Sequence, residues 1–183
     1  MLILASRSPQ RRAILEQLGI AFEVRVAAVQ ELESGPPEEA AAENARRKAC
    51  AVAAQAPGAL VLGADTIVEL DGRIYGKPAD ALAARATLEA LSGRRHTVIS
   101  GVCLIEDGRV SAALARTAVR FRELGAELID WYLASGEWRD RAGGYAVQGH
   151  GAALVAALEG DYLNVVGLPV ATLLDLRPGL LLG

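Results

Sequence analysis

ALVLGADTIVELDGRIYGKP, residues 59–78, contains a buried strand, a glycine and a charged side chain in close succession. The apolar run at 60–62 predicts a strand covered on both faces. Gly63 then allows another backbone or a ligand to come close, because it has no side chain. Asp65 follows, and a carboxylate beside such a run is costly to bury unless it is paired, hydrogen-bonded or bound to a metal. Asp65 is therefore a candidate functional residue.

The second half of this stretch predicts a hairpin that returns toward a lysine. Asp71-Gly72 is a two-residue turn signal, and the returning arm carries Lys77. We therefore expect Asp65 and Lys77 to come together at one end of a sheet. Two interpretations stay open for this pair: a structural ion pair across the hairpin, or part of an active site.

The composition is that of a globular protein. A chain of 183 residues fits one ordinary domain, and 52% hydrophobic with 22% charged residues excludes disorder. Apolar runs are interrupted well before the roughly 20 residues of a membrane span, so we expect a soluble protein without a membrane partner. The formal net charge of -3 argues against a nucleic-acid partner, which normally selects a basic excess.

The two cysteines and the first residues indicate a cytoplasmic protein. Cys50 and Cys103 lack the spacing of a disulfide framework or a zinc site. The N-terminal LILA has neither a basic flank nor a cleavage site, so we expect no secretory signal.

The opening segment has the features of a phosphate site. Residues 1–5 predict a strand, and a helix follows in which Ser8 is the N-cap and Pro9 the first residue. A helix N-terminus with the nearby Arg7, Arg11 and Arg12 can hold a phosphate through free N–H groups and guanidinium forks. The alternative is that Ser8 only caps the helix and the arginines are solvated.

A second strand is predicted over 21–29, and a long helix over 37–55. Glu39, Glu43 and Arg47 recur at four-residue spacing on this helix, which predicts intrahelical ion pairs. Lys48 lies one residue beyond that series and can point elsewhere.

The elements expected in the rest of the chain are helices, strands and a turn. They are a helix over 79–91, a hairpin of strands 97–105 and 115–121, a helix over 127–134, a strand over 152–158, a polar turn at 161–164 and a helix over 169–176. From its position in the sequence, His96 can be a surface, packing or catalytic residue.

A glycine-rich stretch covers residues 140–151. Glycines at this density let backbone approach a ligand closely, and the amide of Gln148 can both donate to and accept from a base edge. A simple connector between strands is the alternative.

Three separate stretches thus place basic or polar groups beside predicted strand ends, which suggests a cleft for a polyphosphate. Asp65 and Glu31 could hold a divalent cation or activate water there. The chain has no GxxxxGK[ST] motif and no G-x-S-x-G elbow, so neither a P-loop nor an acyl-transfer site is expected.

Several segments, in order, resemble the Maf family. They are LILASRSPQRRAILEQLGI at 2–20, GADTIV at 63–68, GKP at 76–78, LSGRRH at 91–96, AGGYAVQG at 142–149 and NVVGLP at 164–169. The resemblance implies a nucleoside triphosphate pyrophosphatase that releases a monophosphate and pyrophosphate with a divalent cation, Mg²⁺ or Mn²⁺. It implies an elongated, two-lobed α/β fold with a mixed sheet, similar to inosine triphosphate pyrophosphatases. Residues 1–183 would form one such domain with a central nucleotide cleft.

The same resemblance assigns roles to individual residues. Asp65 falls on the catalytic aspartate that accepts a proton from the attacking water, and Glu31 on an acidic residue that helps to hold the metal. The positions that match the family's phosphate-binding residues are Ser8, Arg11, Lys48 and Lys77. Arg141 stands where many members have lysine, which keeps the charge and changes the donor geometry.

Base preference is where the chain departs from the family pattern. Members that prefer dTTP and UTP carry an arginine after the Ser-Pro, a threonine after the catalytic aspartate and a glutamine in the glycine-rich stretch. Thr66 and Gln148 match, whereas Gln10 replaces the arginine. Relatives that hydrolyse 7-methyl-GTP carry a tryptophan at that position and lack the Asp-Thr pair, so we expect pyrimidine triphosphates, canonical or modified.

An alternative from another class is a non-catalytic, nucleotide-binding regulator of septum formation and cell division. The resemblance also suggests a homodimer.

Overall fold

The structure is a computed structural model that describes residues 1–26 and 28–182. Within these residues seven strands form one mixed sheet in the order β2-β1-β3-β5-β6-β7, with β4 paired to β3. The strands β2, β1 and β3 are parallel, and all other pairs are antiparallel. Their bounds are β1 (Leu2–Leu4), β2 (Phe22–Val24), β3 (Leu60–Leu70), β4 (Arg73–Tyr75), β5 (Arg95–Glu106), β6 (Arg109–Phe121) and β7 (Val155–Glu159). The predicted α/β class with a mixed sheet is confirmed.

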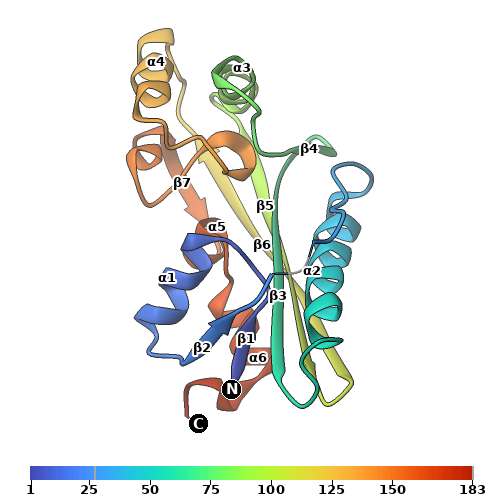
Figure 1. The fold of residues 1–183 in the computed structure, drawn as a ribbon. Coiled ribbons are helices and arrows are strands. Elements are labelled where there is room, and N and C mark those ends of the chain that lie inside the picture. The colour runs from blue at the N-terminus through green and yellow to red at the C-terminus, as the bar shows by residue number, and fades with distance from the viewer. Residues whose placement is uncertain (27, 183) are drawn as a thin grey trace.

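The helices cover both faces of this sheet, and the molecule is elongated along β3, β5 and β6 (Figure 1). α2 lies along one face, and α1, α5 and α6 lie against the other. α3 and α4 cover the far end. Their bounds are α1 (Pro9–Gln17), α2 (Pro37–Ala53), α3 (Ala81–Leu91), α4 (Ala126–Ser135), α5 (Tyr162–Val166) and α6 (Val170–Leu176), with 3₁₀ turns at Ala142–Gly144, His150–Leu154 and Pro178–Leu181. No helix in the described ranges is long and apolar enough to cross a bilayer.

The two faces of β3 follow from the two-residue period of a strand. Val61 packs with the alanines of α2, whereas Leu62 and Ala64 pack with α1, α5 and α6. Because both faces are covered, the run reads as continuously apolar, as the sequence predicted. Asp65 therefore faces α2, and its neighbour Thr66 faces the opposite side.

α2 approaches the sheet closely because two glycines lie beneath it. A Cβ at Gly63 would overlap the backbone oxygen of Ala45 and lie 2.8 Å from the backbone nitrogen of Ala49. A Cβ at Gly101 on β5 would likewise overlap the backbone oxygen of Ala41. The predicted close approach at Gly63 is therefore made by the backbone of α2.

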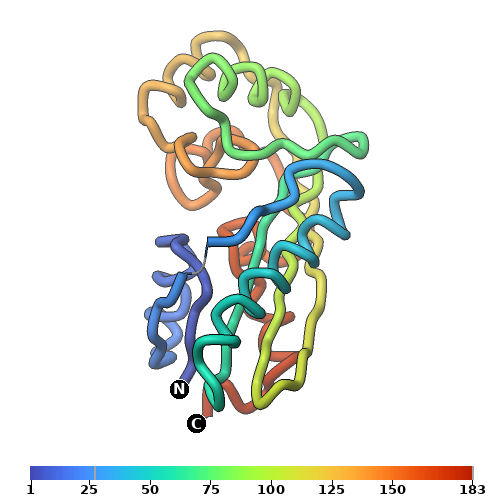
Figure 2. Tube along the Cα trace, turned by 45° about the vertical axis from the view of Figure 1, so that its right-hand side comes forward, coloured from blue at the N-terminus to red at the C-terminus, as the bar shows by residue number. Residues whose placement is uncertain are grey.

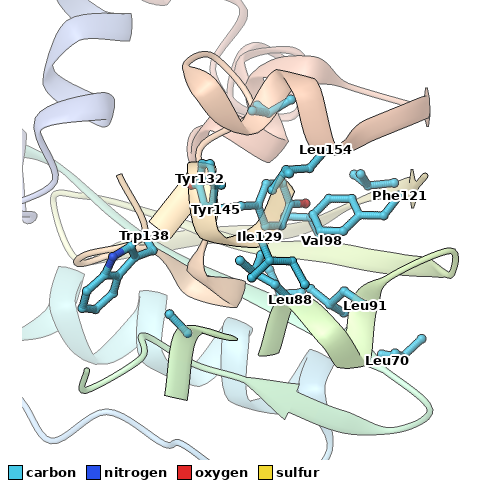
Figure 3. Packing of buried hydrophobic residues seen from close by; sticks show 14 residues of the cluster. Leu70, Leu88, Leu91, Val98, Phe121, Ile129, Tyr132, Trp138, Tyr145 and Leu154 are labelled. Carbon is cyan, nitrogen blue, oxygen red and sulfur yellow. The ribbon is translucent and has the colours of Figure 1, made fainter. Parts of the chain in front are cut away.

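An aromatic cluster fills the far end between β5, β6, α3 and α4 (Figure 3). His96 is 1% exposed, and its Nε2 lies 2.9 Å from the hydroxyl of Tyr145. Its ring meets the rings of Phe121 and Tyr145 edge to face, with centroids 4.9 and 5.5 Å apart. His96 is thus a packing residue, and burial lowers its pKa to about 4.

Some element boundaries differ from the prediction. Of the strand expected over 21–29, β2 covers Phe22–Val24, and residue 27 lies outside the described residues. Residues 150–154 form a 3₁₀ turn, so β7 starts at Val155 instead of at residue 152. The polar turn expected at 161–164 starts α5, because the Asp161 side chain accepts from the Leu163 N–H and caps a helix. The turns Asp71-Gly72 and Asp107-Gly108 are in place, each with positive φ at both residues.

Candidate active site

Asp65 lies in the middle of β3, so the expectation that it sits at one end of the sheet was wrong. On one edge of β3, β1 pairs with residues 60–62 and β4 pairs with residues 68–70. β5 occupies the whole opposite edge. Residues 63–67 therefore have no strand partner on the first edge within the described chain. Asp65 and Thr66 lie on this unpaired part of β3. Sequence alone did not reveal the gap, because it depends on where β1 and β4 stop pairing with β3.

The carboxylate of Asp65 is held by α2. Lys48 Nζ lies 2.6 Å from Asp65 Oδ1 and 2.9 Å from Glu31 Oε1. Asn44 Nδ2 donates to Asp65 Oδ2 over 2.9 Å. Among the described residues Lys77 makes no ion pair with Asp65, so the interpretation as an ion pair across the hairpin was also wrong. Lys48 does leave the surface series of its helix, as its position predicted, while Glu43 pairs with Arg46 and Arg47.

Asn44 is a residue that the sequence reasoning missed. It is 1% exposed and hydrogen-bonds the backbone of Leu32 as well as Asp65. A signal was available, because Asn44 precedes Lys48 by four residues and therefore shares its helix face.

Arg11 is buried instead of solvated. Its Nε donates to the Gly167 carbonyl (2.8 Å), Nη1 to Ser6 Oγ (2.9 Å) and Nη2 to Thr66 Oγ1 (3.1 Å). Burial lowers its pKa, and attraction from Asp65 and Glu31 opposes that effect. Three of its five N–H donors are thus used within the protein, which leaves two for a ligand.

Of the other residues of the opening motif, Ser8 caps α1 and Arg12 lies on the surface. The Ser8 hydroxyl accepts from the Arg11 N–H (3.4 Å) and donates to Gln10 Oε1 (3.1 Å), so Ser8 caps α1 as the alternative proposed. Arg12 lies on the surface 3.7 Å from Glu16 and is not among the residues that line the cavity described below.

Thr66 is engaged on the face opposite Asp65. Its hydroxyl lies 2.8 Å from Ser100 Oγ and accepts from Arg11. Thr66 therefore connects Arg11 to the sheet, and its hydroxyl is already hydrogen-bonded within the protein.

One cavity of about 760 Å³ brings together all ten residues to which the family resemblance assigned a role. This volume is within the range of small-molecule sites. The residues are Ser8, Gln10, Arg11, Glu31, Lys48, Asp65, Thr66, Lys77, Arg141 and Gln148. They come from the β1–α1 connection and the start of α1, the segment before α2, α2 itself, β3, the β4–α3 connection and the 139–148 segment.

The cavity is cationic although the protein is acidic. Among the described residues, six lining side chains are basic and three are acidic: Arg7, Arg11, Lys48, Lys77, Arg139 and Arg141 against Glu31, Asp65 and Asp140. A local balance of +3 within a chain of net charge -3 focuses positive potential on the cleft. Arg139 and Asp140 had not been recognised from the sequence.

The glycine-rich stretch packs against other segments of the protein instead of approaching a ligand. Gly143 has φ 67°, its N–H donates to the Gly76 carbonyl over 3.1 Å, and a Cβ there would lie 2.8 Å from Val68. The stretch thereby fixes Arg141 and Gln148 at the cavity. Arg141 Nε is buried without a hydrogen-bond partner within the described chain, and Gln148 is exposed.

The donor set limits how a metal could bind. The described residues contain no group of three His, Cys, Asp or Glu side chains arranged to hold an ion. Asp65 and Glu31 converge on a single point, the Lys48 ammonium group. Mg²⁺ is commonly held by one or two carboxylates, waters and substrate phosphates. The residues therefore fit a cation that arrives with a phosphate ligand, and they do not form a complete protein cage.

Comparisons with known proteins cover nearly the whole chain. The family model described as Maf-like protein matches residues 1–177. A dTTP/UTP pyrophosphatase of Symbiobacterium thermophilum is 50% identical over 171 residues, covering 92% of this chain and 88% of the relative. One from Pyrococcus horikoshii is 45% identical over 179 residues, covering 96% and 95%. One from Anaeromyxobacter sp. is 50% identical over 182 residues, covering 96% and 87%. This chain belongs to the Maf family.

Proposed function

We propose that this protein is a nucleoside triphosphate pyrophosphatase that hydrolyses dTTP and UTP to the monophosphate and pyrophosphate. The observation that carries the proposal is the Asp65 carboxylate, held by Lys48 at 2.6 Å inside a cavity with a cationic lining. Relatives of 45–50% identity that bear this activity in their names support it. We further propose that residues 1–183 form one domain of two lobes, with the nucleotide in the cavity between them.

Asp65 is the proton acceptor for the attacking water in this proposal. The side chain is 10% exposed, so it is shielded from bulk solvent while its oxygens stay fixed by α2. A base fixed within hydrogen-bonding reach of the water contributes about 10²–10⁴-fold to the rate. Reaction at an anhydride needs such a base because water itself is a poor nucleophile.

The cations supply the electrostatic part of the catalysis. Lys77 and Arg141 line the cavity without an ion-pair partner in the described chain, so their charge is available for the phosphates. Arg11 has two free N–H donors and a fixed orientation, and Ser8 lies beside it at the start of α1. Preorganised donors of this kind stabilise the charge that develops in phosphoryl transfer.

Glu31 and Asp65 are the residues that would hold a divalent cation, Mg²⁺ or Mn²⁺. When bound, such a cation neutralises phosphate charge and polarises the scissile anhydride. Lys48 lies between the two carboxylates, so it offsets their mutual repulsion.

Gln148 is the side chain best placed to select the base. It is exposed at the cavity, and its amide has both a donor and an acceptor for the O4 and N3–H edge of uracil or thymine. Gln10 lies in the first turn of α1 and its Oε1 accepts from Ser8, whereas the Thr66 hydroxyl is engaged by Arg11 and Ser100. Thr66 would therefore influence selectivity through Arg11.

A panel of canonical and modified triphosphates tests this function. Purified protein is incubated with each nucleotide and Mg²⁺ or Mn²⁺, and pyrophosphate and orthophosphate are measured separately. We expect pyrophosphate from dTTP and UTP in preference to purine triphosphates. Orthophosphate as the sole product would contradict the assigned bond, and nucleotide binding without any hydrolysis would favour a non-catalytic regulator.

A further inference from the structure

The segment that carries Glu31 has no regular secondary structure of its own. Residues 28–36 lead into α2, and Figure 2 shows this blue stretch running to the start of α2. A functional carboxylate on such a segment needs support from a rigid element to keep its position. The source of that support is one face of α2.

Three residues of α2 contact this segment from consecutive turns. Asn44, Arg47 and Lys48 have the i, i+3, i+4 spacing that places side chains on one helix face. Arg47 Nη1 donates to the Gln30 carbonyl over 2.9 Å, and Lys48 pairs with Glu31. Arg47 thus holds the backbone of Gln30, and Lys48 holds the side chain of Glu31.

Asn44 makes the most extensive of these contacts. Its Oδ1 accepts from the Leu32 N–H over 2.7 Å, and its Nδ2 donates to the Leu32 carbonyl over 3.0 Å. The same Nδ2 donates to Asp65 Oδ2 over 2.9 Å. The orientation of the amide is fixed, because exchanging its oxygen and nitrogen would place like groups against each other at all three contacts.

These hydrogen bonds join two buried side chains. Asn44 is 1% and Asp65 7% exposed, so neither finds solvent when the other is lost. With Lys48 on Oδ1 and Asn44 on Oδ2, both oxygens of the Asp65 carboxylate have a donor from α2. The plane of the carboxylate is therefore set by two side chains that lie one helical turn apart.

We infer that Asn44 is a positioning residue that fixes Asp65 and the Glu31 segment relative to each other. This role rests on the proposed pyrophosphatase activity. Asn44 does not reach the substrate. It holds the proton acceptor Asp65 by one hydrogen bond and Leu32, the neighbour of Glu31, by two. Loss of the amide lets the two carboxylates move independently, which lowers turnover more than nucleotide affinity, because a base must be placed within a fraction of an ångström.

Two variants separate the contacts that Asn44 makes. Asn44→Ala removes all three bonds. Asn44→Asp keeps an oxygen for the Leu32 N–H, but an ionised carboxylate has no hydrogen to donate and repels Asp65. Thr117→Val is the matched control: Thr117 is 1% exposed and hydrogen-bonded to Asp161 and Asn164, and it is not a cavity residue.

Kinetics with a binding measurement tests the role in catalysis. For each variant, kcat and KM are measured for pyrophosphate release from dTTP, and Kd is measured for the non-hydrolysable α,β-imido analogue of dUTP. We expect kcat to fall about 10- to 100-fold in both Asn44 variants, with Kd changed less than about threefold. Thr117→Val keeps the wild-type kcat. Unchanged kcat in Asn44→Ala, or an equal fall in Thr117→Val, overturns the inference.

Amide hydrogen exchange tests the positioning itself and does not need activity. The Leu32 amide should exchange faster in Asn44→Ala than in wild type, and near the wild-type rate in Asn44→Asp. Unchanged Leu32 exchange in Asn44→Ala overturns the inference. A wild-type protein that releases no pyrophosphate would refute the proposed function, and this exchange measurement would still decide whether Asn44 holds the segment.

Discussion

Lys48 on α2 donates to Asp65 on β3 across 2.6 Å. This contact joins α2 to residues 63–67 of β3, which have no strand partner on one edge within the described chain. Both side chains are almost buried, at 12% and 10% exposure. Both residues also line the cavity, so the pair links α2 to β3 at the candidate site.

Replacing Lys48 by Met should cost both stability and turnover. It leaves Asp65 without its cation and opposite Glu31, and breaking a buried pair costs about 3–5 kcal/mol. We expect the free energy of unfolding in urea to fall by about that amount and kcat to fall more than tenfold. In the double variant with Asp65→Asn, the stability loss should be smaller than the sum of the single losses. Strictly additive losses would show that the pair is not coupled.

Replacing Gly63 by Ala tests whether the close approach of α2 positions the site. The new Cβ overlaps Ala45 and Ala49 backbone atoms, so the helix must move and carry Lys48 with it. Overpacking of this kind costs about 1–3 kcal/mol, and we expect kcat to fall together with stability. Gly179→Ala is the control, because nothing lies within 4 Å of its Cβ. A Gly63→Ala protein that is destabilised but keeps a normal kcat would show that the close approach of α2 does not position the site for catalysis.

Much of this arrangement was predictable from sequence, and the reason differs from residue to residue. The hairpin, the capped α1 and the departure of Lys48 from its surface series follow from local spacing. The gap in β3 does not, because it depends on where β1 and β4 stop pairing. Lys77 was expected beside Asp65, but the observed ion-pair partner is Lys48, since a distance between remote segments is a tertiary property. Asn44 was missed because a lone Asn in a helix usually has only a surface role.

His96 should make stability depend on pH. Burial lowers its folded pKa to about 4 from an ordinary value of 6.5, so between these pH values the unfolded chain binds more protons. Stability therefore rises with pH through this window, and about 3 kcal/mol is lost as the pH falls from 6.5 to 4. Urea unfolding at pH 7, 5.5 and 4 measures it. His96→Gln cannot titrate and should lose less over the same range; an equal loss in both proteins would exclude His96 as the cause.

Gln148 should control base selectivity. Replacement by Ala removes the donor and acceptor that would face the base in the proposed complex, and a bidentate contact is worth about 1–3 kcal/mol. We expect kcat/KM for dTTP to fall roughly tenfold, with a smaller fall for dCTP, so that the ratio of the two decreases. Gln55→Ala, at the end of α2 and outside the cavity, serves as the control. An unchanged dTTP to dCTP ratio in Gln148→Ala would assign base reading to another residue.

The most direct measurement is pyrophosphate release from dTTP by Asp65→Asn, alongside calorimetric binding of the α,β-imido analogue of dUTP. Asp71→Asn, an exposed carboxylate at a turn, is the matched control. Because Asn cannot accept a proton from water, kcat should fall about 10²–10⁴-fold while the analogue still binds, and Asp71→Asn should behave as wild type. Wild-type turnover by Asp65→Asn would contradict the central claim that this carboxylate activates the water.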